Sequence, residues 1–105
     1  MFEVYKAPKF QKKAEKFLDK KELDELEKFI SELKKEKVLG DPLSYDFFRE
    51  KKIGGKRVYF LVYKEIKVVL LVNISKKKYQ QETIDEIKIL LPEFKRYAYE
   101  LRINT

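Results

Sequence analysis

Residues 56–75, KRVYFLVYKEIKVVLLVNIS, decide the fold of this chain. Two apolar runs, residues 58–63 and 66–74, are separated by Lys64 and Glu65. β-Branched and aromatic side chains dominate both runs, which is typical of strands. The short charged break predicts the turn of an antiparallel hairpin, although it lacks a turn residue of the Asn-Gly type. A transmembrane helix is excluded because charged residues interrupt the apolar span before it reaches ~20 residues.

Side chains of the first run alternate between two sets, which places the sets on opposite faces of a strand. Val58, Phe60 and Val62 form the apolar set, and we expect them to face helices. The other set is aromatic or polar-tipped. We expect it to point to the opposite face, beside the cations that flank the hairpin: Arg57, Tyr59, Leu61 and Tyr63.

The segments before the hairpin predict a strand followed by two helices. Residues 2–6 alternate between apolar and polar side chains, as in a strand with one buried face. Asp19, followed three residues later by Glu22, predicts a capping box that opens the second helix. The first helix carries apolar residues at helical spacing, which we assign to the core: Phe10, Ala14, Phe17 and Leu18.

The remaining segments complete an α+β domain. Residues 49–53 are expected to form a strand that two glycines turn into the hairpin. After the hairpin, helical spacing predicts one helix up to Leu91, and Pro92 is expected to break it before a last helix. The predicted fold is a single domain over residues 1–105. It has a short N-terminal strand and αα-hairpin, an antiparallel sheet of about four strands packed against helices on one face, and C-terminal helices.

The net charge of the chain is +7, and its surplus lies around the hairpin. Residues 49–78 contain ten Lys or Arg against Glu50 and Glu65, a local charge of +8, whereas the rest has fifteen cations and sixteen anions. Such a localised surplus favours an anionic partner, nucleic acid above all, over lysines that only keep the protein soluble. Residues 76–78 also precede a predicted helix N-terminus, where the macrodipole disfavours each cation by ~0.3–1 kcal/mol. This cost favours a phosphate-binding role.

The composition removes several kinds of site. The chain has no cysteine and no histidine. This excludes a disulfide framework, a thiolate metal site, a cysteine nucleophile and a histidine base. No metal and no cofactor are expected. Because Met1 leads directly into a mixed polar and apolar segment, we expect a cytoplasmic protein without a membrane partner.

The order of elements over nearly the whole chain resembles the RelE/ParE superfamily of type II toxins. The resemblance is sharpest over residues 49–82, where a basic strand is followed by Gly-Lys-Arg-Val-Tyr, a second apolar strand and a Lys-rich step into a helix. RelE-like members are ribosome-dependent mRNA endonucleases, members of the ParE branch poison DNA gyrase, and a small antitoxin neutralises both. The resemblance therefore implies a cognate antitoxin, the ribosome and mRNA as partners.

The RelE-like branch implies metal-independent attack of a 2′-OH on the adjacent phosphate, which needs a base, cations for the developing charge and an acid for the leaving oxygen. By resemblance, Arg57 binds the scissile phosphate, and Lys77 stabilises charge or protonates the leaving group. Lys52 is a further catalytic candidate in the basic strand. Neighbouring cations are candidates for binding RNA phosphates: Arg49, Lys51, Lys56, Lys76 and Lys78.

The chain departs from the RelE pattern at the tyrosine of the last helix. Thr83 stands at that position and cannot serve as a base. Tyr79 lies one helical turn earlier and is the catalytic candidate in its place, with Tyr59 and Tyr63 as alternatives from the sheet. Neighbouring ammonium groups would favour a phenolate and lower the pKa of such a tyrosine. The alternative is that Tyr79 is only a surface aromatic.

Three functions are therefore open. The first is a toxin of a type II toxin-antitoxin system that cleaves mRNA on the ribosome and inhibits translation. The second is a non-catalytic ParE-like toxin or binding module that uses the basic sheet face to bind gyrase, nucleic acid or an antitoxin. In the third, the basic face is only the docking surface for an acidic antitoxin. Arg57 and Lys77 favour the first function, and Thr83 favours the second.

Overall fold

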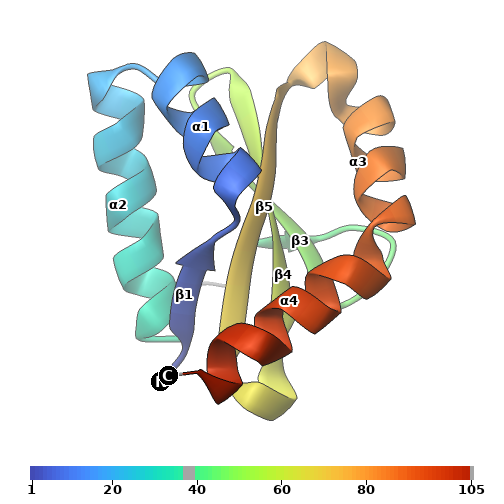
Figure 1. Ribbon diagram of the computed structural model, residues 1–105. Helices are drawn as coiled ribbons and strands as arrows, with labels where there is room; N and C mark the ends of the chain where they lie inside the picture. The colour runs from blue at the N-terminus through green and yellow to red at the C-terminus, as the bar shows by residue number, and fades with distance from the viewer. Residues whose placement is uncertain (37–39, 105) are drawn as a thin grey trace.

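The computed structural model describes residues 1–36 and 40–104 and shows a central sheet with helices on both sides (Figure 1). The predicted α+β class is confirmed. Two 3₁₀ turns, η1 (Lys64–Ile66) and η2 (Lys77–Tyr79), flank the last strand. The strands and helices follow in this order: β1 (Glu3–Lys6), α1 (Pro8–Phe17), α2 (Lys20–Lys34), β2 (Asp41–Pro42), β3 (Phe48–Ile53), β4 (Lys56–Tyr63), β5 (Val68–Lys76), α3 (Gln80–Ile89) and α4 (Leu91–Ile103).

The sheet has five strands in the order β1-β5-β4-β3-β2. β4 pairs antiparallel with both β3 and β5, which confirms the predicted hairpin. β1 pairs parallel with β5, so the sheet is mixed, and the expectation of a purely antiparallel sheet is wrong. The two-residue strand β2 adds the fifth strand. The alternation of a strand reveals which side is buried but not the direction of its partner.

The connection inside the hairpin is longer than the predicted two-residue turn. Residues 64–66 form the 3₁₀ turn η1, and Lys67 has a left-handed backbone with φ of 55°. β5 therefore begins at Val68, two residues later than expected. The left-handed residue supplies the chain reversal that an Asn-Gly turn would otherwise provide.

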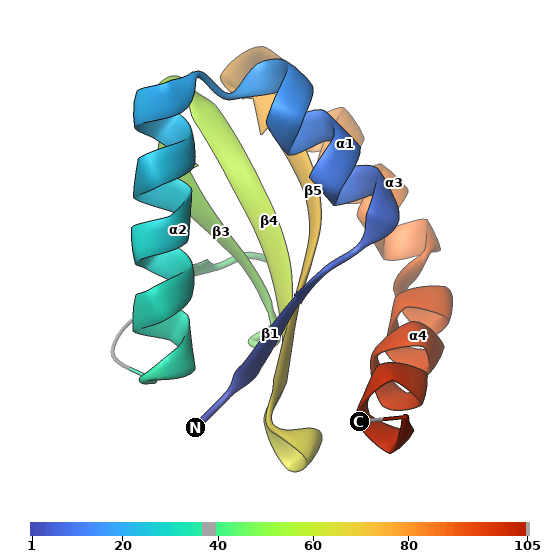
Figure 2. The same cartoon turned by 60° about the vertical axis from the view of Figure 1, so that its left-hand side comes forward.

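Helices cover both faces of the central hairpin. Figures 1 and 2 show α1 and α2 on one side of the sheet and α3 and α4 on the other. Phe60 makes an edge-to-face contact with Phe29 of α2, with ring centroids 5.4 Å apart, and Tyr63 makes one with Tyr99 of α4 at 6.4 Å. All side chains of residues 58–63 are at most 5% exposed. The expectation that Tyr59, Leu61 and Tyr63 point away from helices is therefore wrong.

Local signals at the helix ends are confirmed. The Asp19 carboxylate accepts a hydrogen bond from the Glu22 backbone N–H at 2.8 Å, and Glu22 Oε1 accepts one from the Asp19 N–H at 3.0 Å. The predicted break between the last two helices is present, but α3 ends at Ile89 rather than at Leu91. Leu91 begins α4, and Pro92 lies in its first turn, where its missing N–H costs no hydrogen bond. Phe17 differs from its prediction, because its side chain is 41% exposed whereas the other apolar residues of α1 are buried. Within the described residues, no helix is long and apolar enough to span a membrane.

Phe60→Ala is expected to lower the free energy of unfolding by about 3–5 kcal/mol, because the ring is fully buried at the centre of the sheet and its loss leaves a cavity. A domain of this kind has only about 5–15 kcal/mol of stability in total. Urea denaturation monitored by circular dichroism measures the change. Phe17→Ala is the matched control and should cost about 1 kcal/mol or less. An equal effect of the two substitutions would contradict the packing of β4 against α2.

Candidate nucleic-acid interface

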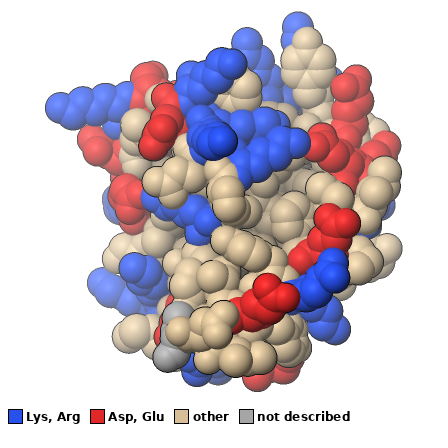
Figure 3. All heavy atoms as spheres, viewed as in Figure 1, with Lys and Arg blue, Asp and Glu red and all other residues tan. Residues whose placement is uncertain are grey.

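A basic groove of about 620 Å³ lies at the C-terminal end of β5, between α1 and the start of α3. Two exposed aromatic rings, Phe17 and Tyr79, and the hydroxyls of Ser75 and Thr83 also line it. Among the described residues that line the groove, none is acidic. Figure 3 shows Lys and Arg side chains gathered at this upper end of the molecule. Five lysines surround the groove: Lys13, Lys16, Lys56, Lys76 and Lys78.

Helix α1 forms one wall of the groove because the short strand β1 covers only the first half of the edge of β5. β1 pairs only with the first residues of β5, and α1 then runs beside the rest of that strand (Figure 2). Lys13 Nζ reaches the exposed edge, where it donates to Asn73 Oδ1 at 2.6 Å and to the Ile74 carbonyl at 3.4 Å. Burial, with a smaller contribution from neighbouring Lys9, lowers the pKa of Lys13, and Glu86 partly opposes this. The wall thus carries a preoriented ammonium group.

The sequence-based candidates did not include this wall. The apolar stripe of α1 predicts a core position for Phe17, and no motif marks Lys13 and Lys16 as a site. A signal was present, since lysines recur at positions 9, 12, 13 and 16 and therefore extend along one side of the helix. The sequence does not reveal what this side of α1 packs against. The parallel pairing of β1 with β5 brings it to the end of β5.

The opposite wall comes from the lysines at the end of β5 and in η2. Lys76 ends β5, and Lys77 and Lys78 belong to η2, which leads into α3 as predicted; all three residues are exposed. The Lys78 ammonium lies 5.0 Å from the centroid of the Tyr79 ring, which is 45% exposed. Lys77 is exposed but does not line the groove. Within the described part of the chain, none of these three lysines has an ion pair.

Arg57 is held by a buried carboxylate rather than directed into the groove. Its Nη1 donates to Glu50 Oε1 at 2.9 Å, and Gln80 Nε2 of α3 donates to the other oxygen of Glu50 at 2.7 Å. The side chains of Arg57 and Glu50 are only 11% and 7% exposed. Arg57 is paired in the sheet with Ser75, which lines the groove. It therefore lies next to the groove with its charge balanced by Glu50.

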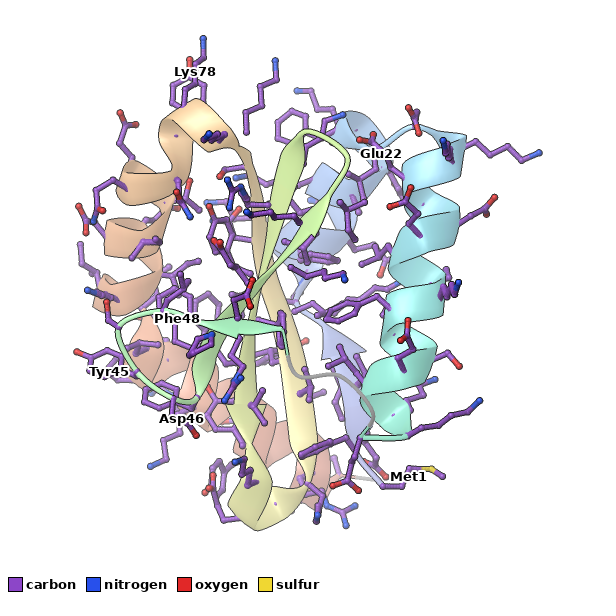
Figure 4. The ribbon with its side chains drawn as sticks, turned by 180° about the vertical axis from the view of Figure 1, so that it is seen from behind. Met1, Glu22, Tyr45, Asp46, Phe48 and Lys78 are labelled. Atoms are coloured by element: carbon purple, nitrogen blue, oxygen red, sulfur yellow. The ribbon has the colours of Figure 1, made fainter. Side chains whose placement is uncertain are left out.

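The other predicted cations separate into groove and non-groove residues. Lys56 lines the groove but is paired with Glu22 at 2.8 Å. Arg49 binds Asp46 and the Gly40 carbonyl, away from the groove. Figure 4 shows Glu22 and Lys78 at one end of the molecule and Asp46 much further along it.

Lys51 and Lys52 do not line the groove either. The Lys51 ammonium lies over the Phe29 ring, on the α2 side of the sheet, 5.4 Å from the ring centroid. Lys52 is exposed on β3. The structure thus brings Lys56, Lys76, Lys78 and Tyr79 together and leaves Arg49, Lys51 and Lys52 outside.

The two tyrosines of the sheet do not fit the role of a base. The Tyr59 hydroxyl is hydrogen-bonded to Ser75 Oγ at 2.8 Å, and burial raises its pKa. Burial also raises the pKa of Tyr63, with the charge of Glu65 adding to the effect. The expected lowering of the pKa is therefore wrong for both. Thr83 donates its hydroxyl to the Tyr79 carbonyl at 2.9 Å. Because Tyr59 and Tyr63 are buried, Tyr79 is the tyrosine that exposes its phenol in the groove lining.

The comparisons with known proteins bear on the fold. No protein-family model matches the sequence, and no curated protein matches it. A solved structure of a mutant of the E. coli toxin RelE in complex with an antitoxin RelBc peptide matches with a TM-score of 0.61. This chain has the RelE-like fold.

The match to RelE covers 78% of this chain and 93% of that chain, at 15% sequence identity. It confirms the resemblance expected from the order of elements, at the level of the fold. A RelE-like fold at this identity establishes the arrangement of strands and helices, and function has to be argued from the site itself.

Proposed function

We propose that the protein is the toxin of a type II toxin-antitoxin system and that it cleaves mRNA on the ribosome. The observation that carries the proposal is the groove at the end of β5, where five lysines and two exposed rings meet without an acidic residue among the described lining. Lysines neutralise phosphates, and exposed rings stack with unpaired bases. The RelE of the matching structure is bound to an antitoxin peptide, which supports a cognate antitoxin as partner of this chain.

The proposed chemistry is attack of a ribose 2′-OH on the adjacent phosphate. Tyr79 lies at the groove surface and, as the phenolate, takes the proton of the 2′-OH to become a neutral phenol. Lys76 and Lys78 line the groove and hold the phosphates. Lys77 lies between them in η2, outside the groove lining, and in this proposal it reaches the leaving oxygen from the rim to supply positive charge or a proton. The reaction uses no metal in this proposal.

Arg57 supplies charge to the transition state from beside the groove. Among the described contacts, only its Nη1 is engaged by Glu50, and a guanidinium has five N–H donors in a fixed fork. Glu50 therefore orients the guanidinium while further donors stay available for a phosphate oxygen. The free donors beside the groove support the phosphate-binding role that the resemblance implies for Arg57, with Glu50 and Gln80 as its positioning residues.

RNA affinity is expected to fall steeply with salt. Five phosphate contacts to a single strand correspond to a slope of log K against log salt concentration of about −3.5. Fluorescence anisotropy of a labelled single-stranded RNA at several salt concentrations measures the slope. The variant Lys76→Ala/Lys78→Ala should reduce the magnitude of the slope by about 1.4. The matched control Lys28→Ala/Lys34→Ala, on exposed positions of α2, should leave it unchanged. A flat dependence in the unmodified protein would refute the electrostatic role of the groove.

A non-catalytic binding module of the ParE type is the second candidate. Two observations favour it: Thr83 occupies the position of the family tyrosine, and the charge of Arg57 is balanced by Glu50. Induced expression in a bacterial host separates the two functions. The proposed toxin stops amino-acid incorporation and leaves plasmid supercoiling unchanged. Loss of supercoiling with continuing amino-acid incorporation would support the ParE type instead.

A further inference from the structure

We infer that the α1 wall of the groove recognises nucleobases, with Phe17 as a stacking platform for single-stranded RNA and with Lys13 and Lys16 binding the adjoining phosphates. This inference rests on the proposed function for the class of its ligand. It adds to that function an element of the chain, α1, that contributes no residue to the proposed cleavage chemistry.

Phe17 is placed for a ligand rather than for the core. It belongs by spacing to the apolar stripe of α1, and Phe10 and Ala14 of that stripe are buried. Phe17 instead is 41% exposed at the rim of the groove. Single exposed apolar residues are common on protein surfaces. What distinguishes Phe17 is that the surface beside it is a lysine-lined groove with a second exposed ring in its lining, Tyr79.

Both walls of the groove combine an aromatic ring with an ammonium group. On α1, Lys13 Nζ lies 6.0 Å from the centroid of the Phe17 ring, and on η2, Lys78 Nζ lies 5.0 Å from that of Tyr79. Each pair matches one nucleotide, because the ring can stack with a base while the ammonium group neutralises the neighbouring phosphate. Lys13 is preoriented by its hydrogen bonds to Asn73 and to the Ile74 carbonyl.

The two rings select a single strand over other anions. In a duplex the faces of the bases are stacked on one another and cannot meet a protein ring, whereas an unpaired strand presents them. An acidic peptide would use the lysines but has no base to place on Phe17 or Tyr79. The groove therefore fits an unpaired RNA segment whose bases lie on the two walls.

Phe17→Leu tests the inference, because it removes the ring and keeps an apolar side chain. The probes are a 2′-O-methyl oligoribonucleotide, which cannot be cleaved through its 2′-OH, and an abasic oligomer of the same length. We expect Phe17→Leu to weaken binding of the first probe by about 5- to 160-fold, the range for one lost stack, and binding of the abasic probe by less than about twofold. Phe17→Trp should retain affinity, and Phe47→Leu, at an exposed ring outside the groove, is the matched control.

Three outcomes would overturn the inference. Equal weakening of both probes would assign Phe17 a structural role, which the thermal midpoint of the variant would show independently. Unchanged binding of both probes would mean that no base lies on Phe17. If a poly-glutamate peptide binds the groove and loses affinity in Phe17→Leu as the base-containing probe does, the groove would be a peptide site.

The binding assay tests this inference separately from the proposed function. The binding assay uses neither ribosomes nor cleavage. If Phe17→Leu shows the base-dependent effect but the protein leaves mRNA intact on ribosomes, the stacking role of Phe17 is supported and the nuclease function is wrong. If the protein cleaves mRNA but its Phe17→Leu variant binds both probes normally, the nuclease function is supported and the stacking role of Phe17 is wrong.

Discussion

Tyr79→Phe is expected to lower the rate of mRNA cleavage by about 10²- to 10⁴-fold, the usual contribution of a general base. The substitution keeps the ring and its contact with Lys78 and removes only the hydroxyl oxygen. Binding should therefore persist, with ribosome affinity within about twofold of the unmodified protein. Single-turnover cleavage of mRNA on stalled ribosomes measures the rate, and a filter-binding assay measures the affinity.

Tyr45→Phe is the matched control for this prediction. Tyr45 is an exposed tyrosine with a lysine ammonium over its ring, as Tyr79 is, but it lies outside the groove. Its substitution should leave the cleavage rate unchanged. If Tyr79→Phe retains full activity, the 2′-OH proton is taken by another group or the chemistry is purely electrostatic, and the role assigned to Tyr79 is wrong.

Removal of Arg57 should cost on the order of 10²-fold or more in cleavage, because it takes a positioned cation away from the charge that develops on the phosphate. Arg57→Ala alone also leaves the buried carboxylate of Glu50 without its cation, and breaking such a buried pair costs about 3–5 kcal/mol of stability. The double variant Arg57→Ala/Glu50→Gln avoids this by neutralising the carboxylate. It keeps an amide in place of the group that accepts from Gln80.

The double variant separates catalysis from folding. We expect it to unfold at nearly the denaturant concentration of the unmodified protein and to lose cleavage to the same extent as Arg57→Ala. Glu50→Gln alone keeps Arg57 and an amide oxygen that can accept its hydrogen bond, so its activity should lie between that of the unmodified protein and that of the double variant. A folded double variant that cleaves at the normal rate would show that Arg57 has only a structural role.

Local features of the fold could be predicted from the sequence, and long-range ones could not. The hairpin, the capping box at Asp19 and the helix break before Pro92 each depend on residues within a few positions of one another. The parallel pairing of β1 with β5 joins residues about sixty-five positions apart, such as Glu3 and Val68, and no local pattern specifies its direction. This pairing places α1 at the groove, so the wall formed by Lys13 and Phe17 was missed with it.

The count of cations around the hairpin located the basic end of the molecule but not its available charges. Arg49, Lys56 and Arg57 each have an acidic partner, and for Lys56 that partner, Glu22, comes from a distant helix. Formal charge adds along a sequence, whereas pairing depends on which side chains meet in the fold. The place of residues 76–78 just before a helix could be predicted, because it depends only on neighbouring residues in the chain.

The most direct test of the central claim is the mapping of mRNA ends after the purified protein is added to translating ribosomes. The proposed mechanism predicts new ends inside the translated region, only when ribosomes are present, with a 2′,3′-cyclic phosphate on the upstream fragment and no such ends for Tyr79→Phe. Intact mRNA under conditions in which the protein is bound to ribosomes would contradict the nuclease function and support a non-catalytic binding module.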